Sequence, residues 1–213
     1  MKAVVKVGGG RGFIIRHRME YPPSKGKRCF VHERIVITAG HCLPYFPPCF
    51  PDSFLGERTY KSLLGTLHAP KLKVWAECLF VDPIGDIAVL GCPDRQDLGE
   101  QADAYDALTA EAPALRVGKA ARSGSAWLLA LNGQWVPCAV ELLGNKDLWI
   151  GATSKNEAGM SGSPILADDG MAIGVLSVGS ESTSREGVRK LEKSGPHPVL
   201  AHHLPGWLLR ELK

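Results

Sequence analysis

The stretch "LFVDPIGDIAVLGC", Leu79 to Cys92, places two short apolar runs on either side of a group of turn residues. The proline and glycine of "DPIG" interrupt regular structure, whereas the valine, isoleucine and leucine beside them favour β-strands. The pattern therefore predicts a strand, a turn and a second strand.

The same pattern recurs at fairly even spacing along the 213 residues. Each half of the chain holds about six short apolar runs, which is typical of a β-barrel or a β-sandwich. The runs of the first half are "AVVKV", "GFIIRH", "CFVHERIVITA", "YKSLLGTL", "KLKVWAECLFV" and "DIAVLGC". Those of the second half are "ALRVGKA", "SAWLLAL", "VPCAVELL", "LWIGAT", "SPILAD" and "AIGVLSVG".

We therefore predict two β domains, residues 1–93 and 116–203, followed by a short C-terminal helix over residues 204–213. Residues 94–115 connect the domains; this segment is acidic, rich in alanine and poor in β-formers, so it is a linker or a short helix. Pro205 suits a helix start, and Trp207, Leu208 and Leu212 fall on one face of the final helix.

Charge and hydropathy exclude several kinds of partner. The net charge is +3 and the basic residues are scattered, apart from "SKGKR", so we expect no nucleic-acid ligand. No apolar run approaches the ~20 residues of a membrane span, so we expect no membrane partner. The beginning, "MKAVVKVGGGRGF", lacks the apolar segment of a signal peptide, so we expect a cytoplasmic protein. A trimmed chain would hide an export signal, and the protein would then be secreted or periplasmic.

The cysteines and histidines do not form a metal motif. None of the six cysteines forms a C-x-x-C pair, which argues against a zinc ribbon or a thioredoxin site. We expect mostly free thiols and would test Cys29 with Cys42 first for a disulfide, because they flank one predicted hairpin. His197, His202 and His203 lack further ligands beside them and are expected to be surface or capping residues. We expect no metal and no cofactor.

Three polar residues stand where chemistry is plausible. His41 follows the apolar strand of "RIVITAGHCLP", Asp86 precedes the run Ile87–Leu90, and Ser161 lies in "NEAGMSGSPIL". Taken singly, each has an ordinary explanation as a capping histidine, a turn aspartate and a loop serine. An aspartate that enters a buried strand needs a hydrogen-bond donor, however, and Asp82 suits the turn better than Asp86 does.

Together these residue types make a nucleophile possible. A serine hydroxyl needs a base to take its proton, histidine titrates in the useful range, and a carboxylate sets the tautomer of the histidine. Backbone amides then stabilise the oxyanion that forms. The order His41, Asp86, Ser161 is that of the chymotrypsin fold, while Ser163 breaks the G-x-S-x-G pattern of α/β-hydrolases.

The motifs resemble those of trypsin-like serine peptidases. "TAGHC" is similar to their T-A-x-H-C, "DIAVL" to D-I-A-L-L, "GMSGSP" to G-D-S-G-G-P, and "GVLSVGS" to G-I-V-S-W-G-S. "GRGFII" resembles G-S-G-F-I-I of the bacterial high-temperature-requirement branch, and "SGSP" resembles bacterial glutamyl endopeptidases. The matches run in order from Gly10 to Gly179. The resemblance implies two six-stranded antiparallel β-barrels with the active site between them.

The resemblance also implies roles for single residues. His41 would be the general base, Asp86 its orienting carboxylate and Ser161 the nucleophile. The amides of Gly159 and Ser161 would form the oxyanion hole. Ser177 would lie behind the aspartate, and Ser177, Val178 and Gly179 would pair with the substrate backbone.

The chain departs from the family pattern at two places. Met160 replaces the aspartate that receives the new N-terminus of digestive members, so we predict no trypsin-style zymogen. Lys155, six residues before Ser161, stands where trypsin has its pocket aspartate and would repel Arg or Lys side chains. Lys155 and Asn156 are our candidate pocket residues. Leu176 replaces the histidine by which glutamyl endopeptidases recognise glutamate.

The sequence thus predicts a serine endopeptidase that acts on proteins or peptides, without preference for Arg or Lys. The enzyme is either general or regulated and narrowly targeted, with a regulatory protein as a further partner. The alternative is a catalytically silent trypsin-like domain that binds proteins. The segment "RHRMEYPPSKGKRC", residues 16–29, is expected to be a solvated loop, with a loop at the cleft or a partner contact as the alternatives.

Overall fold

The computed structural model describes residues 2–24, 27–48, 55–110, 112–152, 157–177 and 192–210 of the 213-residue chain. For residues 19–24, 27–32, 55–56, 152, 192–194 and 210 only the backbone is described. No helix in these segments is long and apolar enough to cross a membrane.

The first half of the chain forms a closed antiparallel barrel with the strand order β1-β2-β3-β6-β5-β4. The barrel closes because β1 pairs with β2 on one side and with β4 on the other. Its strands are β1 (Val4–Val7), β2 (Gly10–Ser24), β3 (Lys27–Thr38), β4 (Thr59–Gly65), β5 (Val74–Asp82) and β6 (Ile87–Gly91).

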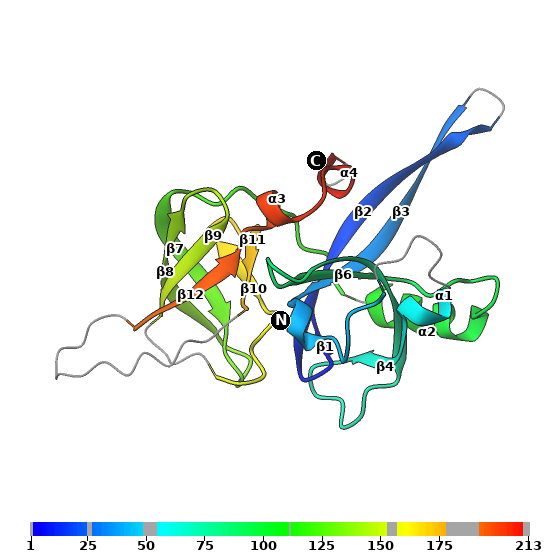
Figure 1. Ribbon diagram of the computed structural model, residues 1–213, viewed down its shortest axis with the longest axis horizontal. Helices are drawn as coiled ribbons and strands as arrows, with labels where there is room; N and C mark the ends of the chain where they lie inside the picture. The colour runs from blue at the N-terminus through cyan, green and yellow to red at the C-terminus, as the bar shows by residue number, and fades with distance from the viewer. Residues whose placement is uncertain are drawn as a thin grey trace.

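The second half forms a six-stranded antiparallel sheet with the order β11-β10-β7-β8-β9-β12. A bridge between Gly174 and Val199 brings the two ends of this sheet together, so it is nearly a barrel. The strands are β7 (Ser123–Leu129), β8 (Trp135–Leu143), β9 (Asp147–Ala152), β10 (Pro164–Ala167), β11 (Ala172–Val175) and β12 (Glu192–Pro198). The predicted all-β class with two six-stranded antiparallel units is confirmed, and the units lie side by side (Figure 1).

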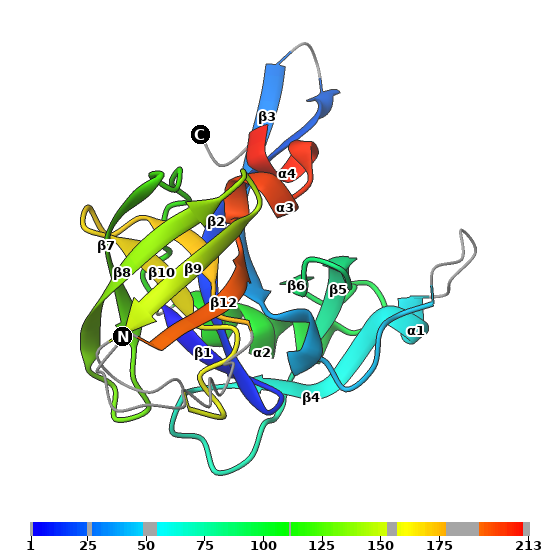
Figure 2. The same cartoon turned by 60° about the vertical axis from the view of Figure 1, so that its left-hand side comes forward.

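Five short helices complete the described fold: η1 (Gly40–Cys42), α1 (Leu55–Arg58), α2 (Gly99–Ala110), α3 (Leu200–His203) and α4 (Gly206–Arg210). Helix α2 lies in the segment between the two sheets. Its buried Tyr105 donates to the carbonyls of Arg34 at 3.0 Å and Leu90 at 3.2 Å, which fastens α2 to the first barrel. Helices α3 and α4 lie beside β2 and β3 (Figure 2). The ring of Trp207 in α4 contacts the ring of His17 in β2 edge-on, with the ring centres 5.9 Å apart.

The apolar core of the first barrel extends to side chains of the second sheet, among them Leu129 and Val175. In the first barrel, Phe13, Ile15, Ile37 and Leu90 are fully or almost fully buried. The second sheet buries a separate cluster that includes Leu128, Leu148, Ile150 and Ile165. The larger apolar cluster therefore packs across the junction between the two sheets.

The segment predicted to be a loop, residues 16–29, is instead mostly strand. Strand β2 pairs with β3 from Gly12↔Thr38 out to Ser24↔Lys27, whereas β1 reaches only Phe13 and β6 reaches only Val36. The outer parts of β2 and β3 therefore form a two-stranded ribbon that projects from the barrel (Figure 1). The backbone pairing of β2 with β3 continues through the residues assigned to the loop.

This ribbon also separates Cys29 from Cys42. Cys29 pairs with Tyr21 in the outer part of the ribbon, nine residues before the end of β3 at Thr38. At about 3.3 Å per residue, the Cα atom of Cys29 lies roughly 30 Å along the strand from that of Thr38, and Cys42 follows Thr38 at the barrel end. The Cα atoms of a disulfide lie within about 7 Å of each other. Cys42 is a buried free thiol, so the Cys29–Cys42 pair is not formed.

Candidate active site

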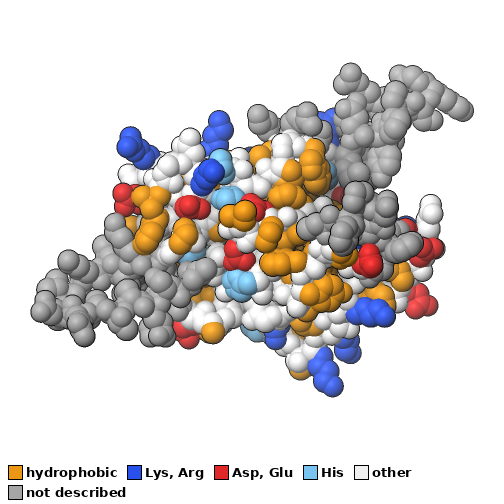
Figure 3. All heavy atoms as spheres, viewed as in Figure 1, with side chains coloured by type: hydrophobic (Ala, Val, Ile, Leu, Met, Phe, Trp, Pro, Cys, Tyr) orange, Lys and Arg blue, Asp and Glu red, His pale blue; other side chains and the backbone are white. Residues whose placement is uncertain are grey.

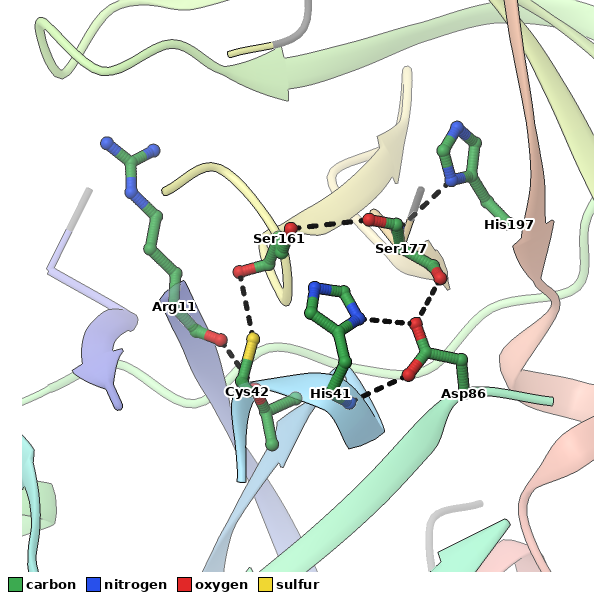
Figure 4. A network of polar contacts seen from close by, with 8 residues as sticks. Arg11, His41, Cys42, Asp86, Ser161, Ser177 and His197 are labelled. Atoms are coloured by element: carbon green, nitrogen blue, oxygen red, sulfur yellow. Dashed lines mark hydrogen bonds and ion pairs between the residues drawn. The ribbon is translucent and has the colours of Figure 1, made fainter. Parts of the chain in front are cut away.

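His41 and Asp86 meet because β3 and β6 are neighbours in the first barrel. The pair Thr38↔Ala88 sets the end of β3 beside the start of β6. The Nδ1 atom of His41 lies 2.7 Å from Oδ2 of Asp86, and the backbone N–H of His41 donates to Oδ1 at 2.8 Å (Figure 4). The carboxylate thus sets both the position and the ring orientation of the histidine.

Asp86 itself sits in an uncommon backbone conformation. Its φ is 53°, in the left-handed region that costs a non-glycine residue roughly 1–3 kcal/mol. Asp82 stabilises the preceding turn by accepting from the N–H groups of Ile84 at 3.0 Å and Gly85 at 2.9 Å. Asp82 therefore shapes the turn, while Asp86 is the aspartate that contacts the histidine.

The pair changes the pKa of both partners. The hydrogen bond to Asp86 raises the pKa of His41 above 6.5, against a smaller opposing effect of burial. Burial would raise the pKa of Asp86, but hydrogen bonds from the His41 ring, the Ser177 hydroxyl and the His41 backbone together lower it below 3.8. At neutral pH the carboxylate is ionised and accepts from its neighbours.

Ser161 comes from the other sheet, on a tight turn just before β10. The turn is closed by bonds from Met160 N to Glu157 O at 3.1 Å and from Ser163 N to Met160 O at 3.0 Å. Gly162 has a φ of +80°, and a Cβ atom there would stand 1.8 Å from the carbonyl oxygen of Arg11. A glycine is required because the turn is pressed against the first barrel.

The hydroxyl of Ser161 donates to the carbonyl of Ser177 at 3.3 Å. The ring of His41 lies between Ser161 and Asp86 (Figure 4), yet no hydrogen bond joins Ser161 to His41 within the part of the chain that the structure describes. Proton transfer from the serine to the histidine therefore requires the hydroxyl to turn away from Ser177. Contacts of this kind often form only when substrate is bound.

Ser177 contacts two of the three candidate residues, Asp86 and Ser161, and also His197. Its hydroxyl donates to Oδ2 of Asp86, its carbonyl accepts from Ser161, and its N–H donates to Nδ1 of His197 at 3.0 Å. The side chain is buried, at 3% exposure. Val178 and Gly179, predicted to extend this segment along a substrate, lie outside the described residues, as do the candidate pocket residues Lys155 and Asn156.

Gly159 and Ser161, the candidate oxyanion residues, flank Met160 on the turn. Neither N–H donates to an acceptor in the segments that the structure describes. Gly159 has a φ of +93°, which favours glycine at this position. Figure 3 shows one face of the molecule, on which histidine and acidic side chains lie near the centre among hydrophobic ones.

Three residues in this region make contacts that were not predicted from sequence. His197 was expected at the surface or as a cap but is fully buried on β12 and accepts from Ser177. His203 is also mostly buried, 3.1 Å from Asp82 and 3.7 Å from Asp147. Arg11 is 6% exposed and donates through its backbone to the carbonyl of Ser161 at 2.7 Å. No local pattern marks these residues, because their partners lie far away in the sequence.

The chain is similar to solved structures of serine proteases. One is the Rv3671c protease in an inactive form, at 17% identity over 99% of this chain and 89% of that chain, with a TM-score of 0.51. Another is an inactive-form serine-to-alanine mutant of Rv3671c from M. tuberculosis H37Rv, at 16% identity over 99% and 86% of the two chains and a TM-score of 0.51. A glutamic acid specific serine protease matches at 13% identity over 94% and 92%, with a TM-score of 0.48.

No family model matches the chain, and no curated protein matches it in sequence. At these identities, the likeness to the Rv3671c structures shows the fold alone, which is chymotrypsin-like.

Proposed function

We propose that this protein is a serine endopeptidase that cleaves peptide bonds in proteins or peptides through an acyl-enzyme. The observation that carries the proposal is the bond of 2.7 Å between His41 and Asp86 of one sheet, beside Ser161 of the other. The fold is the one that the Rv3671c protease uses, which makes peptide substrates the natural class.

In the proposed reaction, His41 takes the proton of the Ser161 hydroxyl as its oxygen attacks the substrate carbonyl carbon. The carbonyl π electrons move to oxygen, and the N–H groups of Gly159 and Ser161 stabilise this oxyanion. When the intermediate collapses, the peptide C–N bond breaks and His41 gives its proton to the leaving amine. Water then attacks the acyl-enzyme in the same way and releases Ser161.

Asp86 supports both steps without becoming protonated. It keeps the proton of His41 on Nδ1, so that Nε2 is free to act as the base, and it stabilises the imidazolium that forms. The raised pKa of His41 is the direct consequence of this contact. Ser177 keeps the carboxylate oriented, and with Val178 and Gly179 we propose that it pairs with the substrate backbone.

The binding of the first residue before the cleaved bond is assigned to Lys155 and Asn156. A lysine in this pocket repels Arg and Lys side chains, so the proposed enzyme does not share the preference of trypsin. Cleavage of a peptide library would measure the substrate range. It would distinguish a general protease from one that acts on a single target.

One observation favours a second candidate, a silent domain that binds proteins. The Ser161 hydroxyl is engaged with Ser177 at 3.3 Å instead of with His41. If this arrangement persisted in the presence of substrate, the serine would stay unactivated while the fold still presented its surface.

A fluorophosphonate probe separates the two candidates, because it reacts only with an activated serine. We expect labelling of the native protein and none of the Ser161→Ala variant. The Ser125→Ala variant, changed at an exposed serine on β7, should be labelled like the native protein. If circular dichroism shows that the native protein is folded but the probe does not label it, the endopeptidase proposal is refuted and the silent protein-binding domain is favoured. Labelling without cleavage of a diverse library would indicate a narrowly targeted protease.

A further inference from the structure

Arg11 is a buried cation that reaches from one sheet to the other. It stands near the start of β2, between Gly10 and Gly12, and is 6% exposed. Its Nη1 donates to the carbonyl of Leu129 at 2.7 Å, and Nη1 and Nη2 each lie 3.2 Å from the carbonyl of Ala130. Leu129 ends β7, so the guanidinium of the first barrel fastens the turn between β7 and β8 of the second sheet.

The backbone of the same residue fastens the serine turn. The N–H of Arg11 donates to the carbonyl of Ser161 at 2.7 Å. The carbonyl of Arg11 accepts from the hydroxyl of Thr38 at 2.7 Å and lies against the Cα of Gly162. Figure 4 shows the backbone of Arg11 on the Ser161 side of the network, with its side chain extending away from His41.

The two contact regions of Arg11 converge on the turn over residues 157–163. A Cβ atom on Gly159 would stand 3.7 Å from Cδ2 of Leu131, the residue after Ala130 in the β7–β8 turn. Gly159 is thus approached by the turn that the guanidinium fastens, while Ser161 is bound by the Arg11 backbone. A displacement of Arg11 would therefore change the contacts of both candidate oxyanion residues, Gly159 and Ser161.

The electrostatics argue that Arg11 does more than fill space. Burial lowers the pKa of Arg11, and its partners in the described segments are carbonyl oxygens, with no carboxylate among them. A buried cation is costly unless it is paired and hydrogen-bonded, so a guanidinium held by carbonyls alone lowers the stability of the fold more than an apolar side chain of the same size would. Met160, in the middle of the turn, is buried and apolar and contributes no charge of its own.

We infer that Arg11 is a positioning residue that keeps the turn over residues 157–163 in its reactive shape. The inference rests on the proposed function, because reactive shape means the arrangement in which Ser161 attacks and the N–H groups of Gly159 and Ser161 stabilise the oxyanion. Met160 stands where digestive trypsin-like peptidases carry an aspartate and cannot form an ion pair. Arg11 would hold the turn in place of such an ion pair.

The test compares Arg11→Ala with Arg34→Ala. Arg34 is a matched control, because it too donates to main-chain carbonyls, those of Thr109 and Ala112, but on the α2 side of the barrel. Two quantities are measured on folded protein: the second-order rate of fluorophosphonate labelling at Ser161, and the amide hydrogen exchange of residues 157–163.

For Arg11→Ala we expect labelling slower by about 10- to 100-fold, in line with the effect of a small misplacement of reacting groups. Exchange in residues 157–163 should be faster. Added methylguanidine, which supplies the same guanidinium donors, should restore part of the labelling rate. For Arg34→Ala we expect a lower midpoint of thermal unfolding but unchanged labelling and exchange, with no effect of methylguanidine.

Unchanged exchange of residues 157–163 in Arg11→Ala would overturn the inference, whether or not the native protein is labelled. An unlabelled native protein would refute the proposed function alone, since the exchange comparison needs no activity. If Arg11→Ala does not fold, Arg11→Met keeps the volume and removes the donors. Labelling and exchange of that variant equal to those of the native protein would likewise refute the role.

Discussion

Asp86 and His41 form the pair on which the proposed chemistry depends, and their contact makes a prediction about pH. The proposed mechanism requires neutral His41, so the rate of Ser161 labelling should rise with pH through the pKa of His41, which the hydrogen bond to Asp86 raises above 6.5. Asp86→Asn removes the negative charge, so the midpoint of this rise should move to lower pH while the rate falls by about 10⁴-fold.

The matched variant for this measurement is Asp82→Asn, because Asp82 lies in the same turn but contacts His203 instead of His41. It should keep a midpoint close to that of the native protein. If Asp82→Asn moved the midpoint and Asp86→Asn left it in place, the assignment of the orienting carboxylate would be wrong.

Gly162 makes a second prediction at the residue scale, with Gly170 as its control. The two have nearly the same φ, +80° and +79°, so alanine costs each about 1–2 kcal/mol of backbone strain. A Cβ on Gly162 would also stand 1.8 Å from the carbonyl of Arg11 and 2.6 Å from Oγ1 of Thr38, whereas nothing lies within 4 Å of one on Gly170.

Gly162→Ala should therefore be destabilised well beyond Gly170→Ala in urea unfolding and should lose Ser161 labelling. Gly170→Ala should stay close to the native labelling rate. Equal losses in the two variants would mean that the close approach of the serine turn to the first barrel does not constrain the protein.

At the scale of elements, helix η1 places a cysteine next to the candidate base, and its thiol should be inert. Cys42 lies 3.7 Å from the carbonyl of Ser161, and burial raises its pKa. Burial also raises the pKa of Cys78 to about 11 and of Cys138 to about 12. Little thiolate is present at neutral pH, so these residues should react slowly with iodoacetamide until the protein unfolds.

Peptide mass spectrometry of alkylated protein, native and in denaturant, measures each cysteine separately. Ser161 labelling should be indifferent to added reductant, because Cys42 is not in a disulfide. Rapid alkylation of Cys42 in the folded protein would show that η1 opens on the time scale of the reaction.

The elements also show what a sequence predicts well. Strands such as β6, with the buried run Ile87–Leu90, follow from local composition, because β-formers bounded by turn residues have few other folds available. The ribbon of β2 and β3 does not follow from local composition, because Pro22 and Pro23 and the charged residues around them favour a loop. In the structure the backbone pairing nevertheless continues past the two prolines.

The candidate site also has one part that the sequence predicts and one part that it does not. His41, Asp86 and Ser161 stand in recognisable local motifs, so the sequence alone is enough to name them as candidates. The partners that position them are set by tertiary contacts: Arg11 and Leu129 are 118 residues apart, and Ser177 and His197 are 20 apart. Nothing in the residues around Arg11 or His197 indicates which carbonyl or N–H they will meet.

The whole molecule depends on contacts that join its two sheets, and His203 provides one beside the candidate site. Its Nδ1 lies 3.1 Å from Asp82 at the end of β5, and its Nε2 lies 3.7 Å from Asp147 at the start of β9. A Cβ on Gly85 would stand 2.2 Å from Nδ1, so the histidine also packs against the turn that leads to Asp86. His203 therefore links the second sheet to the segment that carries the orienting aspartate.

We expect His203→Ala to lower the free energy of unfolding by about 1.5–3 kcal/mol, the range for a hydrogen bond to a charged group. His202→Ala is the matched control, since its side chain is exposed on the same short helix and should change stability little. The effect should depend on pH. Burial opposes ionisation of Asp82, but the N–H of Gly85, the ring of His203 and the N–H of Ile84 together lower its pKa below 3.8.

A lowered pKa means that the ionised carboxylate stabilises the fold above pH 3.8, and that this stabilisation is lost as the pH falls through the folded-state value. The difference between native protein and His203→Ala should thus be full at neutral pH and shrink in acid, as urea unfolding at several pH values would measure. A difference that stayed constant down to pH 2, or equal losses in the two histidine variants, would show that the contact with Asp82 does not join the sheets. The loss should then be traced to packing against Gly85 instead, because that contact carries no charge to titrate.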